Sequence, residues 1–279
     1  DGRLLFTVNT HSNTIAAFHI RADGSLQHVK DSPVSSHGVA PNSLSVSGKT
    51  LLVSNRNEDY HQREALRGAE TASYVSFAIA ESGTPQFVSK VDVDNFQKPT
   101  QVFQSPAHPG IAFGNDFQVD ADFDGAGTRS FLAGTEPRVQ GQLHVFEVGE
   151  GSQLKELSRL PMPETNAGYK YKGMDGVPSM PLGIWTHPTQ PLLYVGLVTR
   201  NELGVYRFNV SGEMTFLGAV ANSGQDICWV LPNAEGSRLY TINNLPRTDL
   251  NGSASTVSTY DISGERAVKP VEIATLALP

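Results

Sequence analysis

The chain has 279 residues, of which 39% are hydrophobic, enough to bury a folded core and too many for an intrinsically disordered chain. Asp and Glu outnumber Lys and Arg by 28 to 21, and the resulting net charge of −7 argues against a non-specific nucleic-acid binder. The single cysteine, Cys228, excludes an internal disulfide and a cysteine-built zinc site, and no apolar run reaches the roughly 18 residues of a membrane-spanning helix. None of these features assigns a cellular compartment.

A repeated pair of predicted strands organises the chain. In each pair, a strand ending in a polar or small residue is followed by a loop and by a second strand with an aromatic residue near its end. In chain order, the pairs occupy residues 3–9 with 13–20, 50–55 with 73–79, 129–135 with 141–148, 191–197 with 202–208, and 237–243 with 255–262. The shared aromatic position holds Phe18, Phe77, Phe146, Tyr206 and Tyr260.

Further predicted strands flank these pairs. A turn containing glycine and a fourth extended segment follow every pair. An apolar strand precedes four of the five pairs, at residues 42–47, 117–122, 182–188 and 227–232. Strands at regular spacing, glycine turns and the lack of a 3.6-residue periodicity predict an all-β fold of four-stranded antiparallel repeats. Closed in a ring, such sheets are the blades of a β-propeller, and a β-sandwich is the alternative.

The predicted strands begin with the second strand of a repeat and end with a fourth strand. One terminus of a propeller normally supplies the strand that completes the other terminus's blade, and here a first strand is missing. We therefore expect either a longer natural sequence or an unusual ring closure. Residues 1–279 are predicted to form a single propeller domain.

Two stretches carry a resemblance to a known family. The first is LLFTVNTHSNTIAAFHIRADGSLQHV with HGVAPNSLSVSGKTLLVSN, and the second is SGQDICWVLPNAEGSRLYTINNLP with STVSTYDI. They resemble the lactonase-type β-propellers, which include propeller-type 6-phosphogluconolactonase and the carboxymuconate-cyclizing enzymes. The resemblance implies seven blades, about two more than the five repeats found here, and a lactone hydrolase or cyclase-like activity.

The functional motif of that family is not retained. The family opens the first strand of its key blade with Gly-Pro-Arg-His, whereas Gly224 is followed here by Gln225, Asp226 and Ile227. Asn244 stands where the family has a glutamate. An amide cannot exchange a proton near neutral pH, and an acid cannot hold an anionic substrate as an arginine does. We therefore predict no activity on 6-phosphogluconolactone, and whether the protein is an enzyme stays open.

The long connections are all predicted to lie on one face of the propeller. They are residues 56–72, 94–113, 161–180 and 245–254, and the turns on the other face are short. Because loops longer than about 12–15 residues are usually functional or disordered, the long-loop face is predicted to be the working face.

Polar residues near strand ends are predicted to surround the channel mouth on this face. The candidate ligand-binding residues are His11, Asn42, Arg56, Asn115, Asp116, Glu136, Arg200, Gln225, Asp226 and Asn244. A set rich in amides suits hydrogen bonding to a small polar molecule. Asparagine at strand ends also caps turns through its own backbone bonds, which is the alternative for each of them. Arg200 and Asp226 are expected either to pair with each other or to hold a ligand.

The segment DADFDG matches the opening of a calcium loop, with Asp120, Asp122 and Asp124 as candidate ligands. The glutamate expected at the twelfth position is replaced by Phe131, and Asp-Gly is also ordinary in a strand-connecting turn. No other cofactor is predicted.

Two functions from different classes fit these features. The first is a lactonase-like propeller that binds, and in its stronger form transforms, a small sugar-lactone-like or carboxylate metabolite. The second is a non-catalytic scaffold that docks another protein through loops 56–72 and 245–254, since a propeller fold does not determine function. Neither a nucleic acid nor a membrane is expected as a partner.

Overall fold

The computed structural model describes residues 2–57, 71–93, 97–116, 141–163, 180–245 and 255–278. Strands dominate these residues, and their helical turns are the short 3-10 segments η2 (Glu150–Ser152), η3 (Val198–Arg200) and η4 (Gly264–Ala267). The all-β prediction is therefore confirmed. Within the described ranges, no helix has the length and hydrophobicity needed to span a membrane.

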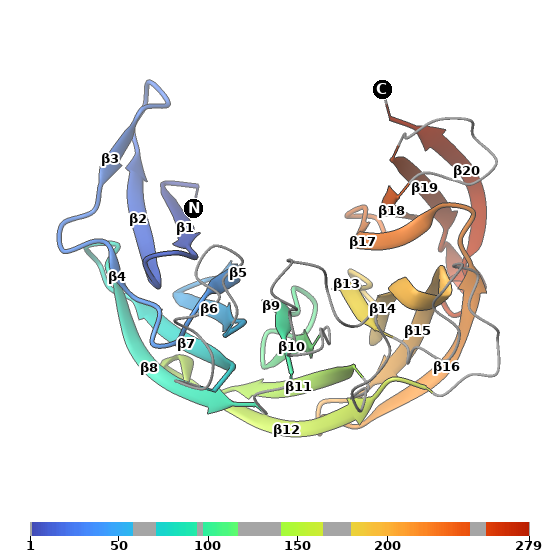
Figure 1. Cartoon of the computed structure of the whole chain (residues 1–279), viewed down its shortest axis with the longest axis horizontal. Coiled ribbons are helices and arrows are strands. Elements are labelled where there is room, and N and C mark those ends of the chain that lie inside the picture. The colour runs from blue at the N-terminus through green and yellow to red at the C-terminus, as the bar shows by residue number, and fades with distance from the viewer. Residues whose placement is uncertain are drawn as a thin grey trace, which may run out of the picture. The chain divides into compact units, whose positions relative to one another are not determined.

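The strands form five four-stranded antiparallel sheets, which confirms the predicted repeat (Figure 1). The first sheet contains β1 (Leu4–Asn9), β2 (Thr14–Ile20), β3 (Leu26–His28) and β4 (Val34–Ser35). In it, β3 and β4 both pair with β2, at opposite ends of that strand. The second sheet has the order β5 (Pro41–Ser47), β6 (Thr50–Asn55), β7 (Ser73–Ile79) and β8 (Pro85–Asp92).

The fourth and fifth sheets follow the predicted strands closely. The fourth has the order β13 (Pro181–Thr186), β14 (Leu192–Leu197), β15 (Glu202–Phe208) and β16 (Met214–Ala221). The fifth has the order β17 (Gln225–Pro232), β18 (Arg238–Leu245), β19 (Thr256–Asp261) and β20 (Val271–Ala277).

The third sheet differs from the prediction. Its strands are β9 (Pro99–Gln104), β10 (Ile111–Asp116), β11 (Gln142–Val148) and β12 (Leu154–Pro161). The assignment of its first two strands to residues 117–122 and 129–135 is therefore wrong, and those segments lie outside the described residues. The prediction of a long connection over 94–113 is also wrong, because β9 and the start of β10 lie within it.

The physical reason is burial. All six residues of β10 are buried, and so are four of the six residues of β9. A Cβ added at Gly114 would lie 2.6 Å from a ring carbon of Tyr74, so a small residue is required within β10. Segments 117–122 and 129–135 have a similar polar and apolar alternation, and the pattern alone does not separate the two possibilities.

The chain divides into two compact units. One comprises Asp1–Gln104, Pro109–Gly114 and Val145–Leu157, and the other comprises Ser105–His108, Asn115–His144 and Ser158–Pro279. The first unit contains the first two sheets, the second unit contains the fourth and fifth sheets, and the division crosses the third sheet. The single-domain organisation stays a prediction.

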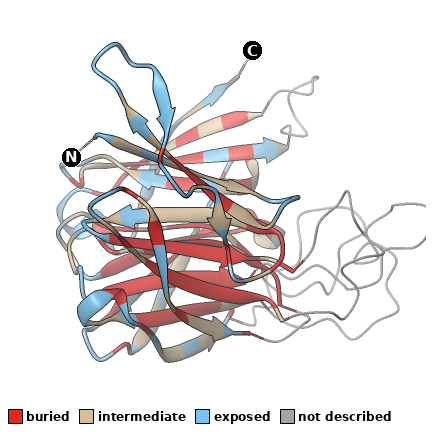
Figure 2. Cartoon of the chain, turned by 90° about the vertical axis from the view of Figure 1, so that its left-hand side faces the viewer, coloured by how far each residue is buried: buried red, intermediate tan, exposed pale blue. Residues whose placement is uncertain are grey.

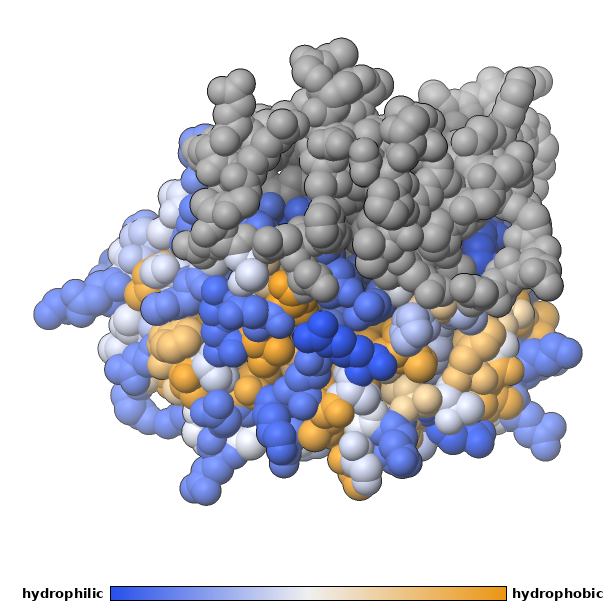
Figure 3. Space-filling view, turned by 60° about the horizontal axis from the view of Figure 1, so that its bottom comes forward, coloured by the Kyte–Doolittle hydropathy of each residue, from blue (hydrophilic) through white to orange (hydrophobic). Residues whose placement is uncertain are grey.

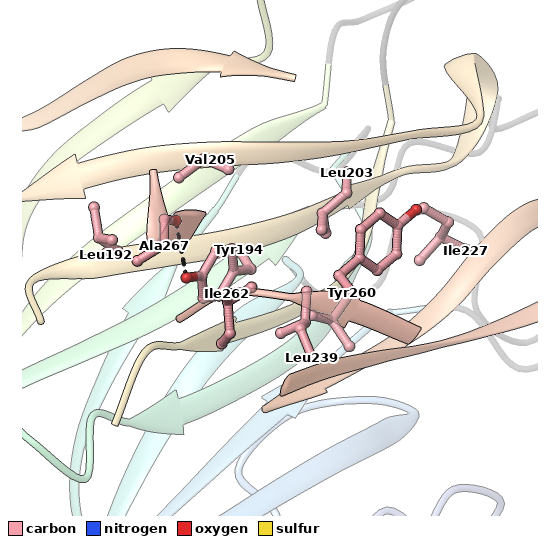
Figure 4. Packing of buried hydrophobic residues seen from close by; sticks show 10 residues of the cluster. Leu192, Tyr194, Leu203, Val205, Ile227, Leu239, Tyr260, Ile262 and Ala267 are labelled. Carbon is pink, nitrogen blue, oxygen red and sulfur yellow. Dashed lines mark hydrogen bonds between the residues drawn. The ribbon is translucent and has the colours of Figure 1, made fainter. Parts of the chain in front are cut away.

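A cluster of buried side chains joins the fourth and fifth sheets of the second unit (Figure 4). Its aromatic members are Tyr194 and Tyr260, and the Tyr194 hydroxyl donates a hydrogen bond of 3.0 Å to the Ala267 carbonyl. The two sheets approach so closely that a Cβ at Gly183 would lie 2.7 Å from the Trp229 Cα. Trp185 packs against this cluster, whereas 45% of Trp229 is exposed.

In the first unit, the first two sheets share a second apolar cluster. Leu4, Phe6 and Val8 recur every second residue along β1, so they lie on one face and pack against buried residues such as Leu51 and Phe77. Buried residues run along the strands and exposed residues gather at turns and outer strands (Figure 2). Hydrophilic and hydrophobic side chains are interspersed on the face that Figure 3 presents.

Candidate functional site

Three sheets share one arrangement where their second strand ends. An asparagine at the end of that strand donates a hydrogen bond to the hydroxyl of the residue that begins the third strand. The pairs are Asn9 with Thr14 at 3.1 Å, Asn55 with Ser73 at 3.3 Å, and Asn243 with Thr256 at 3.0 Å. The same positions face each other in the strand register of all three sheets.

The Asn243 side chain is fully buried and uses both ends of its amide. Its carbonyl oxygen accepts from Asn222 Nδ2 at 2.9 Å and from the Thr241 hydroxyl at 3.3 Å. Its amide nitrogen donates to the hydroxyls of Thr256 and Ser258, each at 3.0 Å. These contacts satisfy the amide inside the protein, as the capping alternative expects.

Glycines make room for two of these asparagines. A Cβ at Gly224 would lie 2.1 Å from Asn243 Nδ2, and a Cβ at Gly38 would lie 2.5 Å from Asn55 Cγ. Gly224 is the one residue that matches the Gly-Pro-Arg-His motif of the lactonase-type propellers. In this chain a glycine is required at position 224 because a side chain there would collide with Asn243.

The fourth sheet departs from this arrangement. Leu197 takes the place of the asparagine and Glu202 the place of the hydroxyl residue, as their register shows. Arg200, at the end of the tight η3 turn, forms an ion pair with Glu202, with Nη2 2.5 Å from Oε2. Only 9% of the Arg200 side chain and 17% of the Glu202 side chain are exposed. A buried charge therefore lies where the first, second and fifth sheets have neutral hydrogen bonds.

The Arg200 guanidinium is incompletely paired. Its Nε and Nη1 are buried and have no hydrogen-bond partner among the described residues. Burial lowers the pKa of Arg200, and the Glu202 carboxylate acts in the opposite direction. The group stays charged, since arginine is not deprotonated in proteins. Buried donors without partners are rare, and each costs about 1–3 kcal/mol.

The η3 turn is attached to the start of β17. Asn201, in the left-handed conformation with φ 52°, accepts a hydrogen bond of 3.0 Å from the backbone N–H of Asp226. Its carbonyl oxygen accepts from the Asn222 N–H at 2.9 Å. These bonds fix the turn that carries Arg200 against the fifth sheet.

Asp226 itself has φ 60°, which is unusual for a residue other than glycine or asparagine. Its Oδ2 lies 3.4 Å from Asn244 Nδ2 and 3.8 Å from Cys228 Sγ. Burial, together with the Asp226 carboxylate, raises the pKa of Cys228 to about 12. The thiol is therefore protonated at neutral pH and is a poor nucleophile.

The remaining candidates of the second unit lie at other strand ends. Gln225 begins β17, opposite Leu245 in the register. Asn115 Nδ2 donates to the carbonyls of Pro181 and Leu182, at 2.9 and 3.0 Å. The buried Asp116 carboxylate lies 2.6 Å from His144 Nε2.

The candidate residues of the first unit lie at separate places in the fold and have different partners. His11 is exposed in the turn after β1. Asn42 Nδ2 donates to the carbonyls of Pro99 and Thr100, and Arg56 follows β6 with its N–H bonded to the Ala40 carbonyl. The candidates outside the described residues are Glu136, Asp120, Asp122 and Asp124. Within the described ranges, no group of three His, Cys, Asp or Glu side chains is arranged to hold a metal ion.

The structure thus brings Asp226 and Asn244 together, and Asn201, which follows Arg200 in the chain, bonds the Asp226 backbone. Arg200 pairs with Glu202 of its own hairpin, not with Asp226. Glu202 and Asn201 were not predicted as site residues. The available signal was the short sequence Thr-Arg-Asn-Glu between two strong strands, which indicates a tight turn that presents its charged side chains together.

No protein-family model matches the sequence, and no curated protein matches it. Among solved structures, the periplasmic gluconolactonase of Pseudomonas aeruginosa is 17% identical with a TM-score of 0.67, and the match covers 99% of this chain and 68% of that one. A protein from Lactobacillus plantarum is 15% identical with a TM-score of 0.68, covering 99% of this chain and 69% of that one.

A protein from Bacteroides uniformis, whose description proposes a 6-phosphogluconolactonase, is 13% identical with a TM-score of 0.66 and is matched over 69% of its length and 100% of this chain. At these identities the likeness shows the fold. The chain has the four-stranded sheets of the lactonase-like β-propellers.

Proposed function

We propose that the protein binds a small sugar-acid-like metabolite through its carboxylate, with Arg200 as the residue that holds the negative charge. One observation carries the proposal: the buried guanidinium has N–H donors on Nε and Nη1 that find no partner among the described residues, while Nη2 contacts Glu202. A carboxylate oxygen that accepts from either nitrogen would satisfy a donor that otherwise lowers stability. Charge-assisted hydrogen bonds of this kind are about twice as strong as neutral ones.

Polar side chains at the start of β17 and the end of β18, to which Asn201 connects the Arg200 turn, support a hydroxyl-rich ligand. Asn244 is exposed, and its contact with Asp226 is long at 3.4 Å, so its amide remains available to hydroxyl groups. Asp226 supplies acceptor oxygens beside it. The solved propellers that resemble this chain include one described as a gluconolactonase and one whose description proposes a 6-phosphogluconolactonase, which favours sugar acids and their lactones as the ligand class.

Binding is proposed without hydrolysis. The arginine, histidine and glutamate of the lactonase-type motif are replaced by Asp226, Ile227 and Asn244. The one thiol, Cys228, is protonated at neutral pH. The alternative of a protein-docking scaffold depends on loops 56–72 and 245–254, which lie almost wholly outside the described residues, and it stays a prediction.

Titration calorimetry with D-gluconate tests the proposal, with D-glucose as the neutral control ligand. The double variant Arg200→Met with Glu202→Gln removes both buried charges, whereas Glu202→Gln alone keeps the cation. Arg207→Met is the matched control, because Arg207 is exposed on the same hairpin.

We expect gluconate binding by the parent, Glu202→Gln and Arg207→Met proteins, at least about tenfold weaker binding by the double variant, and no glucose binding. A factor of ten corresponds to about 1.4 kcal/mol, less than one charged hydrogen bond contributes. Equal gluconate affinity in the double variant, or no binding by the parent protein, would contradict the proposal.

A further inference from the structure

A surface groove lies in the first unit, far along the chain from Arg200. We call it the β4–β8 groove, because the connection that follows β4 forms one wall and β8 forms the other. Its volume is about 680 Å³, and it is lined by Asn13, Ser35, His37, Gly38, Val39, Thr71, Phe87 and Lys90. None of these residues belongs to the proposed gluconate site.

Aromatic rings form part of the groove. The His37 imidazole stacks on the Phe87 ring with 4.1 Å between ring centroids and 25° between ring planes. Phe77 lies beneath Phe87 in an edge-on arrangement, with centroids 6.2 Å apart, and is fully buried. Phe87 is still 45% exposed. The groove therefore offers flat ring surface to a planar ligand, which stacks favourably on aromatic side chains.

The wall that carries His37 is held rigidly. His37 and Ala40 have φ values of 55° and 56°, a left-handed conformation that is costly for residues other than glycine. The Ala40 N–H donates to Asn13 Oδ1 at 2.8 Å, and the Val39 carbonyl accepts from the Asn57 N–H at 2.9 Å. These bonds fix the connection after His37, and the Ser36 N–H fixes it before His37 by donating to the Asn13 carbonyl at 2.9 Å, so the ring surface exists before any ligand binds.

A positive charge lies beside the rings. Lys90 Nζ is 3.0 Å from Asp92 Oδ1, and 27% of the Lys90 side chain is exposed. Asp92 also accepts from the Thr71 hydroxyl at 2.7 Å, so its charge is shared between two donors. The ammonium has three N–H donors, and the pair with Asp92 uses one of them. Loss of hydration and the Lys90 charge lower the pKa of His37, so its imidazole is neutral at neutral pH.

We propose that the β4–β8 groove binds a small aromatic carboxylate, whose ring stacks against His37 and Phe87 and whose carboxylate meets the Lys90 ammonium. A planar ring matches the outer faces of the stacked side chains, and the ligand carboxylate would share the Lys90 ammonium with Asp92, using the N–H donors that the pair leaves over. This inference is independent of the proposed gluconate site, because no residue is shared between them.

The test uses 4-hydroxybenzoate, with phenol as the uncharged control ligand, in titration calorimetry on the full chain. Lys90→Met removes the cation and Phe87→Leu removes the ring while keeping an apolar side chain. Lys49→Met is the matched control, since Lys49 forms an ion pair with Glu81 elsewhere in the same unit. The Arg200→Met with Glu202→Gln variant separates this site from the gluconate site.

We expect 4-hydroxybenzoate affinity to fall at least about tenfold in Lys90→Met and in Phe87→Leu, and to stay unchanged in Lys49→Met and in the Arg200 double variant. Phenol is expected to bind at least about tenfold more weakly than 4-hydroxybenzoate to the parent protein. No binding by the parent, equal affinity in Lys90→Met or in Phe87→Leu, or phenol affinity equal to that of 4-hydroxybenzoate would overturn the proposal. Loss of 4-hydroxybenzoate binding in the Arg200 double variant would also overturn it.

Discussion

Where its second strand ends, the fifth sheet buries Asn243 with partners at both ends of its amide. At the matching place the fourth sheet has Leu197, and it buries Arg200 nearby with Nε and Nη1 unpaired among the described residues. The amide-to-hydroxyl bond of Asn243 recurs at Asn9 and Asn55, although Asn55 Oδ1 is buried without a hydrogen-bond partner in the described ranges. The difference is consistent with an Asn243 network that maintains the fold and with a counterpart in the fourth sheet that serves the proposed ligand binding.

Asn243→Ala gives the largest expected effect on stability. The substitution removes the acceptor of Asn222 Nδ2 and the donor to the Thr256 and Ser258 hydroxyls, and we expect the free energy of unfolding to fall by about 3 kcal/mol. Asn9→Ala is the matched control, because Asn9 is only half-buried, and its loss is expected to be about 1 kcal/mol. Chemical denaturation measures both values, and equal losses would argue against a special role for the buried network.

The two tryptophans sharpen the comparison between the same sheets. Trp185 packs against the cluster between the fourth and fifth sheets, whereas Trp229 of β17, which faces Ile242 in the register, is 45% exposed. Trp185→Ala is expected to lower the free energy of unfolding by about 3 kcal/mol and Trp229→Ala by about 1 kcal/mol. The reverse order in denaturation experiments would show that the packing between these sheets is misassigned.

Acid titration tests the Asp261 carboxylate, which lies at the opposite end of the β18–β19 pair and is held there by hydrogen-bond donors. Hydrogen bonds from the Ser263 hydroxyl and backbone, with help from Arg266, lower the pKa of Asp261 to about 2. The ionised carboxylate therefore stabilises the folded state above about pH 4, and this contribution is lost as the pH falls toward 2.

We expect Asp261→Asn to lower the melting temperature at pH 6 and to lower it clearly less at pH 2.5, where part of the carboxylate's contribution is already lost. Thermal unfolding of both proteins at the two pH values measures the difference. A melting-temperature difference that is the same at pH 6 and pH 2.5 would mean that the carboxylate charge is not responsible.

The smallest effect on stability is expected at the fourth sheet. Replacing Arg200 and Glu202 together by Met and Gln removes both buried charges, and such replacements are often neutral. The free energy of unfolding should change by less than about 1 kcal/mol while gluconate binding is lost. A loss of about 3 kcal/mol would place Arg200 in the fold-maintaining class with Asn243.

Much of the fold could be predicted from the sequence because polar and apolar residues alternate strongly along its strands. The prediction failed in the third sheet, where β9 begins at Pro99 and residues 117–135 carry a similar alternation. Burial selects between such segments, and burial depends on contacts such as that between Gly114 and Tyr74, which a local pattern does not contain.

The candidate site was predicted less completely. The register of the repeats placed Arg200, Asp226 and Asn244 near strand ends. It could not show that Arg200 pairs with Glu202, because that pairing depends on the 3-10 turn over Val198–Arg200 and on the left-handed conformation of Asn201. The β4–β8 groove was missed altogether, because His37 and Phe87 are 50 residues apart and meet only in the folded chain.

A crystal structure of the protein grown with gluconate tests the central claim most directly, since it would locate both the anion and every neighbour of the Arg200 guanidinium. We predict a carboxylate oxygen of gluconate within about 3 Å of Arg200 Nε or Nη1. A structure in which both nitrogens are hydrogen-bonded to groups of the protein, with gluconate absent from this position, would contradict the account.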